Sequence, residues 1–113
     1  MSDKKIDDAV KYLYTHGQLY AEAKAHRVHI EEFRKSQKAL LMKAAIAEKK
    51  ASSSAAAEME AYAHPTYIAL LEGLKAATER EEGFRWGLIS AQARIEVWRS
   101  TEASNRVMDR AVM

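Results

Sequence analysis

The chain has 113 residues, no cysteine, one proline and four glycines, and 30% of its residues are charged with a formal net charge of +2. This length allows one domain at most, and a composition rich in alanine, lysine, glutamate and arginine favours long helices over sheet. The lack of cysteine excludes a disulfide framework and thiolate chemistry, and no apolar run at the N-terminus resembles a signal peptide. No stretch approaches the roughly 20 apolar residues of a membrane-spanning helix. We therefore expect an all-α protein of the cytoplasm with no membrane role.

The first helix is expected from about residue 3 to about residue 50, with Ser2 or Asp3 as its cap. At about 1.5 Å per residue such a helix is on the order of 70 Å long, so we expect an elongated protomer. The apolar face of this helix is interrupted by Gln37, and Arg27 and Arg34 lie close beside that face. The apolar residues that keep helical spacing along it are Ile6, Val10, Leu13, Tyr20, Ile30, Phe33, Leu40, Ala44 and Ala47.

A connector is expected over residues 51–64, because two breaks in the helical pattern lie there. One is Ser52-Ser53-Ser54, and the other is His64-Pro65, where the proline disfavours helix in the residue before it. Residues 55–62 form a short helix if both breaks operate, and the alternative is a first helix that continues through the serines to His64. We favour the break at the serines, and we expect the His64 side chain to satisfy loose backbone groups of the turn.

The last helix is expected from about residue 65 to about residue 110. It carries a heptad pattern over 32 residues that breaks once, at Glu81, and such a stripe requires a partner helix to cover it. We expect an antiparallel hairpin of the two long helices that self-associates, since two helices leave apolar edges exposed. Glu81 is expected to fix register or oligomer state by meeting a basic side chain such as Arg27 or Arg34 across the hairpin. The heptad residues are Tyr67, Leu70, Leu74, Ala77, Glu81, Phe84, Leu88, Ala91, Ile95 and Trp98.

An oligomer interface is expected on the last helix around Trp86, which lies off the heptad stripe. Gly83, Gly87 and Ser90 lie at i, i+4 and i+7 and make a flat surface on which another backbone can approach. Each glycine costs about 0.5 to 1 kcal/mol relative to alanine in a helix interior, so a packing gain should offset it. The alternative is that these glycines mark only a weak point or a kink.

Candidate catalytic groups are scarce in the sequence. Glu22, His26 and His29 share one helical face at a spacing that suits zinc, but one helix without a fourth ligand and without an HExxH pattern indicates solvated histidines instead. The consecutive carboxylates Glu79, Glu81 and Glu82 lack the contrasting environments of an acid–base pair. No phosphate loop, nucleophile elbow or Cys/His pair is present. We expect no enzyme activity, no metal and no cofactor.

Positive charge is concentrated in one segment of the chain. Residues 22–50 hold eight bases against four acids, whereas residues 51–82 hold two bases against six acids. A basic helix edge can follow a phosphate backbone, and Tyr62 and Tyr67 near the turn offer rings for base stacking. The alternative is that the lysines only solubilise the helix and both tyrosines pack into the hairpin end. The candidate nucleic-acid-binding residues are Arg34, Lys35, Lys38, Lys43, Lys49 and Lys50.

The order of features resembles the UvsY recombination mediators of T-even phages. The resemblance is carried by Tyr20-Ala21-Glu22-Ala23, by the basic run from Arg34 to Lys43, by the small-residue connector, and by a long helix containing Trp98-Arg99. It implies a ring-like helical oligomer that binds single-stranded DNA through basic residues and loads a recombinase onto DNA coated by single-strand-binding protein. By position Lys38 and Lys43 best match the DNA-contacting segment, while Ala51-Ser52-Ser53-Ser54 replaces the family's aromatic, glycine-rich turn.

Two hypotheses of different classes follow. The first is a homo-oligomeric phage-type accessory protein that binds single-stranded DNA, with a recombinase or a single-strand-binding protein as a further partner. The second is a helical interaction module, an adaptor or an inhibitor of a host protein, that uses Trp86 and the acidic segment from Glu72 to Glu82 and has no DNA role. The sequence chooses neither the subunit number nor the partner.

Overall fold

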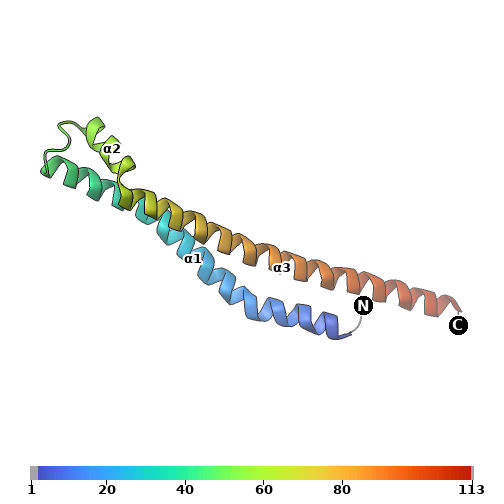
Figure 1. Cartoon of the computed structure of the whole chain (residues 1–113). Helices are drawn as coiled ribbons and strands as arrows, with labels where there is room; N and C mark the ends of the chain where they lie inside the picture. Colours follow the sequence, from blue (N-terminus) through green and yellow to red (C-terminus); the bar gives the residue numbers. More distant parts are fainter. Residues whose placement is uncertain (1–2, 113) are drawn as a thin grey trace. The chain divides into compact units, whose positions relative to one another are not determined.

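The computed structural model of the chain describes residues 3–112 and consists of three α-helices (Figure 1). Helix α1 spans Asp3–Ala47, α2 spans Ser54–Ala63 and α3 spans Pro65–Val112. The expectation of an all-α fold, with two long helices joined by a short one, is confirmed. The expected cap at Ser2 lies outside the described residues.

Helix α1 ends three residues earlier than the sequence indicated, because the chain turns at Lys49. Lys49 has a φ of 60°, the left-handed conformation that usually follows a helix. Its N–H donates to the Ile46 carbonyl at 3.1 Å, and the N–H of Lys50 donates to the Ala45 carbonyl at 2.9 Å. These two bonds are those of a Schellman motif, which satisfies the last carbonyls of α1 and stops the helix.

Helix α2 begins at a side-chain cap, Ser53, and ends at His64, whose N–H donates to the Ala61 carbonyl at 3.2 Å and whose side chain caps the start of α3. Ser53 accepts a hydrogen bond from the Ala56 N–H at 3.1 Å, as an N-cap serine does. At the other end the His64 Nδ1 accepts from the Thr66 N–H at 3.0 Å, and Pro65 begins α3. The break at the serines and the turn role of His64 are therefore both confirmed.

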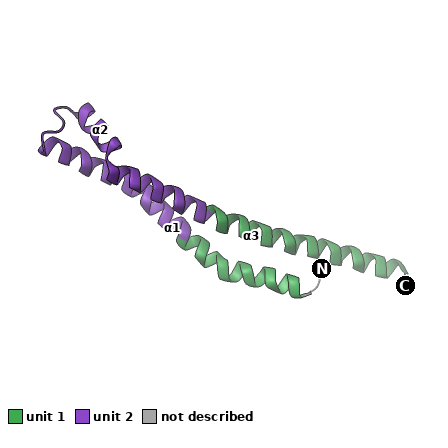
Figure 2. Ribbon diagram, viewed as in Figure 1, with its two compact units in different colours: residues 1–22, 82–113 green, residues 23–81 purple. Residues whose placement is uncertain are grey.

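The chain divides into two compact units (Figure 2). The first comprises Met1–Glu22 and Glu82–Met113, and the second comprises Ala23–Glu81. The first unit pairs the beginning of α1 with the part of α3 from Glu82 onward. The second unit contains α2 and the remaining parts of the two long helices. The single helical domain expected over residues 1–113 thus resolves into two units that share α1 and α3.

The expected heptad stripe of α3 is the buried face of this helix in both units. In the second unit Tyr67, Ala77 and Glu81 are buried, and in the first unit Ala91 is buried. The other six stripe residues are half-buried: Leu70, Leu74, Phe84, Leu88, Ile95 and Trp98. Every position of the heptad, including the interrupting glutamate, therefore faces a neighbouring helix.

The apolar face expected for α1 is partly wrong. Val10, Phe33, Leu40, Ala44 and Ala47 are exposed. Eleven of the buried and half-buried positions of α1 instead form a second stripe, along which the spacing alternates strictly between three and four residues, and four of its members are polar. These positions are Ile6, Ala9, Leu13, His16 and Tyr20 in the first unit, and Ala23, Arg27, Ile30, Arg34, Gln37 and Leu41 in the second.

The core of both units is made almost entirely of alanine. Of the nine buried hydrophobic residues, eight are alanine and the ninth is Tyr67. Among residues 3–112 no large side chain is fully buried. Small side chains let helices approach closely but bury little apolar area per residue. The described fold therefore leaves large apolar side chains such as Trp86 and Leu40 accessible.

Candidate nucleic-acid interface

Three of the six expected nucleic-acid-binding residues line one hollow in the second unit. Arg34, Lys35 and Lys38 of α1 surround it together with Tyr62 of α2 and Tyr67 of α3. Its volume is about 400 Å³, which lies within the range of roughly 300 to 1,000 Å³ of small-ligand pockets. The structure thus brings together the cations and the two rings that the sequence placed 24 or more residues apart.

Lys38 is the most constrained cation of this hollow. Its Nζ lies 3.6 Å from an Oε1 of Glu58 and 4.6 Å from the centroid of the Tyr62 ring. A side-chain hydrogen bond with Tyr62, followed by the charge of Glu58, raises the pKa of Lys38 above its ordinary value. Lys38 therefore stays charged throughout the neutral range while it contacts both an acid and an aromatic face.

The two tyrosines of the hollow differ in accessibility. Their rings meet edge to face, with centroids 5.3 Å apart and an interplanar angle of 74°. Tyr67 belongs to the α3 stripe and is 7% exposed, whereas Tyr62 is 45% exposed. Tyr67 therefore supports Tyr62, and Tyr62 is the more accessible ring of the two.

Arg34 and Lys35 complete the positive lining of the hollow. Arg34 is half-buried at a stripe position of α1, and within the described part of the chain its guanidinium takes part in no ion pair. Lys35 is exposed, with its Nζ 3.5 Å from Glu32. The Arg34 guanidinium is half-buried and has no anionic partner within the described residues, and two further cations, Lys35 and Lys38, line the same hollow. This arrangement attracts a negatively charged ligand.

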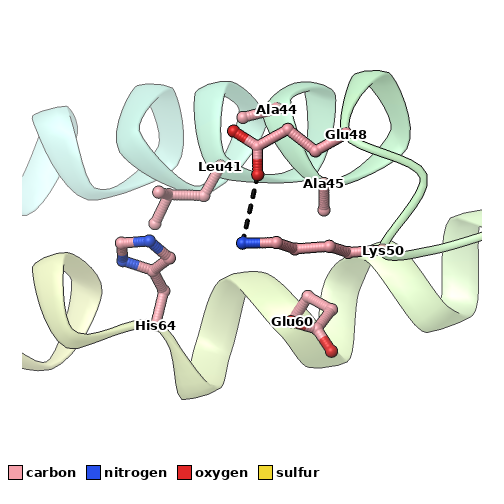
Figure 3. A pocket seen from close by; sticks show the side chains of 7 residues that line it. All are labelled: Leu41, Ala44, Ala45, Glu48, Lys50, Glu60 and His64. Atoms are coloured by element: carbon pink, nitrogen blue, oxygen red, sulfur yellow. Dashed lines mark ion pairs between the residues drawn. The ribbon is translucent and has the colours of Figure 1, made fainter.

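The other three expected cations lie beyond the hollow. Lys43 and Lys49 are exposed. Lys50 lines a separate hollow of about 70 Å³, where its Nζ is 3.1 Å from Glu48 and where Glu60 also lies (Figure 3). The carboxylates of Glu48 and Glu60 offset the positive charge of Lys50 in this second hollow.

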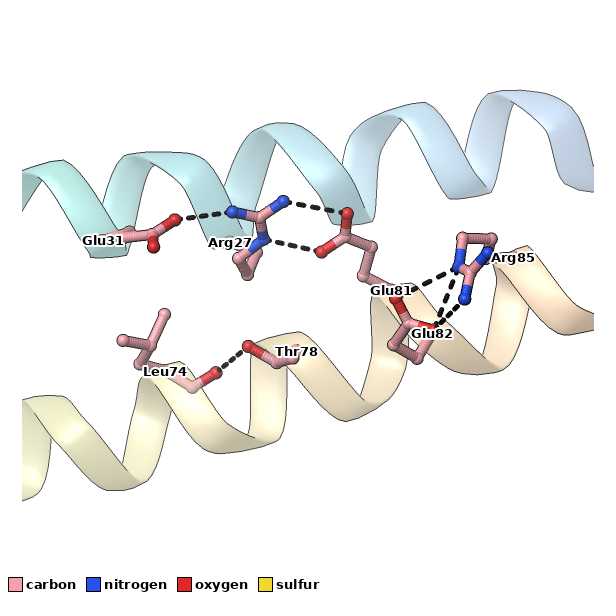
Figure 4. A network of polar contacts seen from close by, with 7 residues as sticks. All are labelled: Arg27, Glu31, Leu74, Thr78, Glu81, Glu82 and Arg85. Atoms are coloured by element: carbon pink, nitrogen blue, oxygen red, sulfur yellow. Dashed lines mark hydrogen bonds and ion pairs between the residues drawn. The ribbon is translucent and has the colours of Figure 1, made fainter.

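The polar interruption of the α3 stripe is paired as the sequence indicated. The Arg27 Nε donates to Glu81 at 2.7 Å and Nη2 donates to the other carboxylate oxygen at 3.1 Å (Figure 4). Nη1 donates to Glu31 at 2.5 Å, and these hydrogen bonds raise the pKa of Arg27 further. Glu81 is only 5% exposed. This bidentate layer fits one alignment of α1 against α3 and so fixes the register of the second unit.

The four residues of the expected oligomer interface have different environments in the first unit. Gly87 receives the Tyr12 ring of the same chain, and a Cβ at Gly87 would lie 3.0 Å from the Tyr12 Cζ. Gly83 and Ser90 are exposed, and Trp86 is 59% exposed with the Arg85 guanidinium 4.9 Å from its ring. Gly87 thus serves packing within the unit, while the other three remain accessible.

Those three accessible residues begin a second, uncharged stripe on α3. Its members again alternate three and four residues apart, and all are exposed. The stripe is offset by two positions from the buried one, roughly 200° around the helix, so it lies on the opposite face. Its members are Gly83, Trp86, Ser90, Ala93, Val97, Ser100, Ser104, Val107 and Ala111.

The candidate metal and acid–base residues gain no partners that suit either chemistry. Glu22 accepts a hydrogen bond from Gln18, His26 is exposed, and the His29 ring lies 6.2 Å from Phe33. Among residues 3–112 no group of three or more His, Asp or Glu side chains is arranged to hold a metal ion. Within the first unit Glu82 pairs with Arg85 at 2.9 Å. Each of these interactions is of a kind that stabilises helices.

Comparisons with protein-family models, with curated proteins and with solved structures give no match to this chain. None of the helices over residues 3–112 combines the length and the apolar character that a bilayer crossing requires.

Proposed function

We propose that this protein is a homo-oligomeric accessory protein that binds single-stranded DNA through the hollow between α1, α2 and α3 of the second unit. The observation that carries the proposal is the convergence of Arg34, Lys35 and Lys38 with an accessible Tyr62 ring. Cations that follow a phosphate backbone and a ring on which a base stacks are the two components of sequence-independent single-strand binding.

Lys43 and Lys49 extend the proposed path of the strand along α1 and beyond its end. Both are exposed, and Lys49 occupies the left-handed position after the helix, where glycine is usual. A lysine there costs roughly 1 kcal/mol in backbone strain, so we infer that its charge is retained for a purpose other than stability. Lys50 contributes through the general positive field.

Self-association is the second part of the proposal. The alanine core and the absence of fully buried large side chains over residues 3–112 leave apolar surface that further copies can cover. The uncharged back stripe of α3 that begins with Gly83, Trp86 and Ser90 is the surface we assign to that contact. Several copies, each making a few weak phosphate contacts, reach useful affinity through avidity.

The resemblance to recombination mediators supplies the cellular role in this proposal. We infer that the oligomer acts on DNA in the cytoplasm and helps to load a recombinase onto strands coated by single-strand-binding protein. Its work is assembly, without bond chemistry and without a cofactor. The support for this role is the order of sequence features, with Lys38 and Lys43 in the basic segment.

Fluorescence anisotropy with a labelled single-stranded oligonucleotide tests DNA binding directly. Reversal of charge at Lys38 and Lys43 to glutamate should lower affinity by about tenfold or more at low salt. The matched control is the same reversal at Lys5 and Lys11, which are exposed on the same helix but lie in the other unit. No binding by the wild type at low salt, or equal losses in the two double variants, would contradict the proposal.

The stacking component has its own test at Tyr62. Replacement of Tyr62 by alanine should weaken binding by about 1 to 3 kcal/mol, the contribution of one stacked base. Tyr62→Phe keeps the ring and should retain most of the affinity, although it loses the hydroxyl that contacts Lys38. Equal affinities for the two variants would show that the ring does not stack on a base.

A helical protein-interaction module is the second candidate, and the exposure of Trp86 favours it. A large aromatic ring that is 59% exposed beside Arg85 is typical of a partner contact. This reading predicts no DNA binding at low salt, together with recovery of one host protein that withstands nuclease treatment and is lost in Trp86→Ala. DNA binding by the wild type at low salt would favour the first candidate, in which Trp86→Ala weakens binding through loss of self-association.

A further inference from the structure

Glu58 lies beside the cation that an incoming phosphate would use. Its Oε1 is 3.6 Å from the Lys38 Nζ, and it is four residues before Tyr62 on α2. Side chains four residues apart share one face of a helix. Helix α2 therefore presents a carboxylate and an aromatic ring together to the same ammonium group, so that Lys38 already has an anionic partner.

A carboxylate and a phosphate compete for the same donor. Both accept charge-assisted hydrogen bonds from an ammonium group, so Lys38 cannot give its full charge to both. Because Glu58 belongs to the same chain, its effective concentration at Lys38 is high and independent of dilution. Arg34, which also lines the hollow, has no such competitor among residues 3–112.

We propose that Glu58 is a built-in competitor of the DNA phosphate at Lys38, an inference that rests on the proposed function. A strand first gains the unpaired Arg34 and then displaces Glu58 from Lys38, which leaves the exposed Glu58 carboxylate in water. The competitor lowers the affinity of each site. Weak individual sites allow an oligomer to release a strand stepwise, as a factor that passes DNA to another protein requires.

The test compares two single-charge variants of α2. Glu58→Gln removes the competitor, and Glu60→Gln is its matched control, since Glu60 is exposed on the same helix but lines the separate hollow with His64 and Lys50. Both variants raise the formal net charge from +2 to +3. A difference in affinity between them therefore reflects the position of the lost carboxylate and not the net charge. Affinity for a labelled single strand is measured by anisotropy at low salt, and circular dichroism verifies that the helix content is unchanged.

Glu58→Gln is expected to bind the strand about two- to fivefold more tightly than Glu60→Gln, the range set by release of one solvent-accessible ion pair. In a Lys38→Gln background the two variants should bind equally, because the competition requires the ammonium group. Equal affinities of the two variants with Lys38 present, or weaker binding by Glu58→Gln, would overturn the inference while leaving the proposed function intact. Failure of the wild type and of both variants to bind would overturn both.

Discussion

The Arg27–Glu81 layer allows the sharpest prediction about stability. Arg27→Leu removes the guanidinium that donates to both oxygens of a carboxylate only 5% exposed. A buried carboxylate that loses its charge partner costs roughly 3 to 5 kcal/mol. We take the lower end, about 3 kcal/mol, as the destabilisation expected in this variant, because the Arg27 side chain is 25% exposed and water can therefore reach the layer.

The reverse substitution should be far milder. Glu81→Leu restores an apolar residue to the α3 stripe, and burial of a leucine contributes about 1.5 to 3 kcal/mol. Arg27 keeps its ion pair with Glu31 at 2.5 Å in this variant, and its side chain is 25% exposed, so water can reach the guanidinium. The double variant Arg27→Leu/Glu81→Leu replaces the layer with an apolar pair, and such replacements are neutral or stabilising by about 1 to 4 kcal/mol.

Urea unfolding followed by circular dichroism, at neutral pH and one protein concentration, measures the three variants against the wild type. The expected order of stability places Arg27→Leu lowest and the double variant at or above the wild type. If the two single variants lose equal stability, or if the double variant loses as much as the two single variants together, the buried Glu81 carboxylate is not the cause of the instability of Arg27→Leu.

Two further pairs of substitutions test local features of the fold. Ser53→Ala should destabilise the protein by about 1 kcal/mol, because it removes the N-cap of α2, whereas Ser52→Ala at a neighbouring exposed position should change stability by less than about 0.5 kcal/mol in thermal unfolding. Gly83→Ala, with no atom within 4 Å of its new Cβ, should stabilise by about 0.5 to 1 kcal/mol, whereas Gly87→Ala should show no such gain, because its Cβ would overlap the Tyr12 hydroxyl; equal gains in urea unfolding would show that Tyr12 does not pack there.

The sequence identified the buried face of α3 because nine of its ten stripe residues are apolar or alanine, and the exception, Glu81, has its partner at Arg27. On α1 the predicted face was right at some positions and wrong at others, because four positions of the observed stripe are polar. Where His16, Arg27, Arg34 and Gln37 occupy the stripe, the apolar pattern led instead to exposed neighbours. Steps of three and four residues in strict alternation, starting from Ile6, give the observed stripe.

The five residues that line the candidate hollow could all be named from the sequence, but their acidic neighbour Glu58 could not. A basic run and two tyrosines near a turn pointed to Lys38, Tyr62 and Tyr67, and the structure joins them. Glu58 could not be predicted, because nothing in the sequence indicates which acid of α2 contacts which lysine of α1. That contact depends on where α1 ends, which a lysine in a left-handed conformation at residue 49 decides without the usual glycine signal.

Light scattering coupled to size-exclusion chromatography, with and without a labelled single-stranded oligonucleotide, tests the central proposal most directly. The account predicts a mass that is a multiple of the 12.7 kDa chain, with the oligonucleotide eluting with the protein at low salt and separating from it as salt rises. A species of 12.7 kDa that elutes apart from the oligonucleotide at low salt would contradict both self-association and single-strand binding.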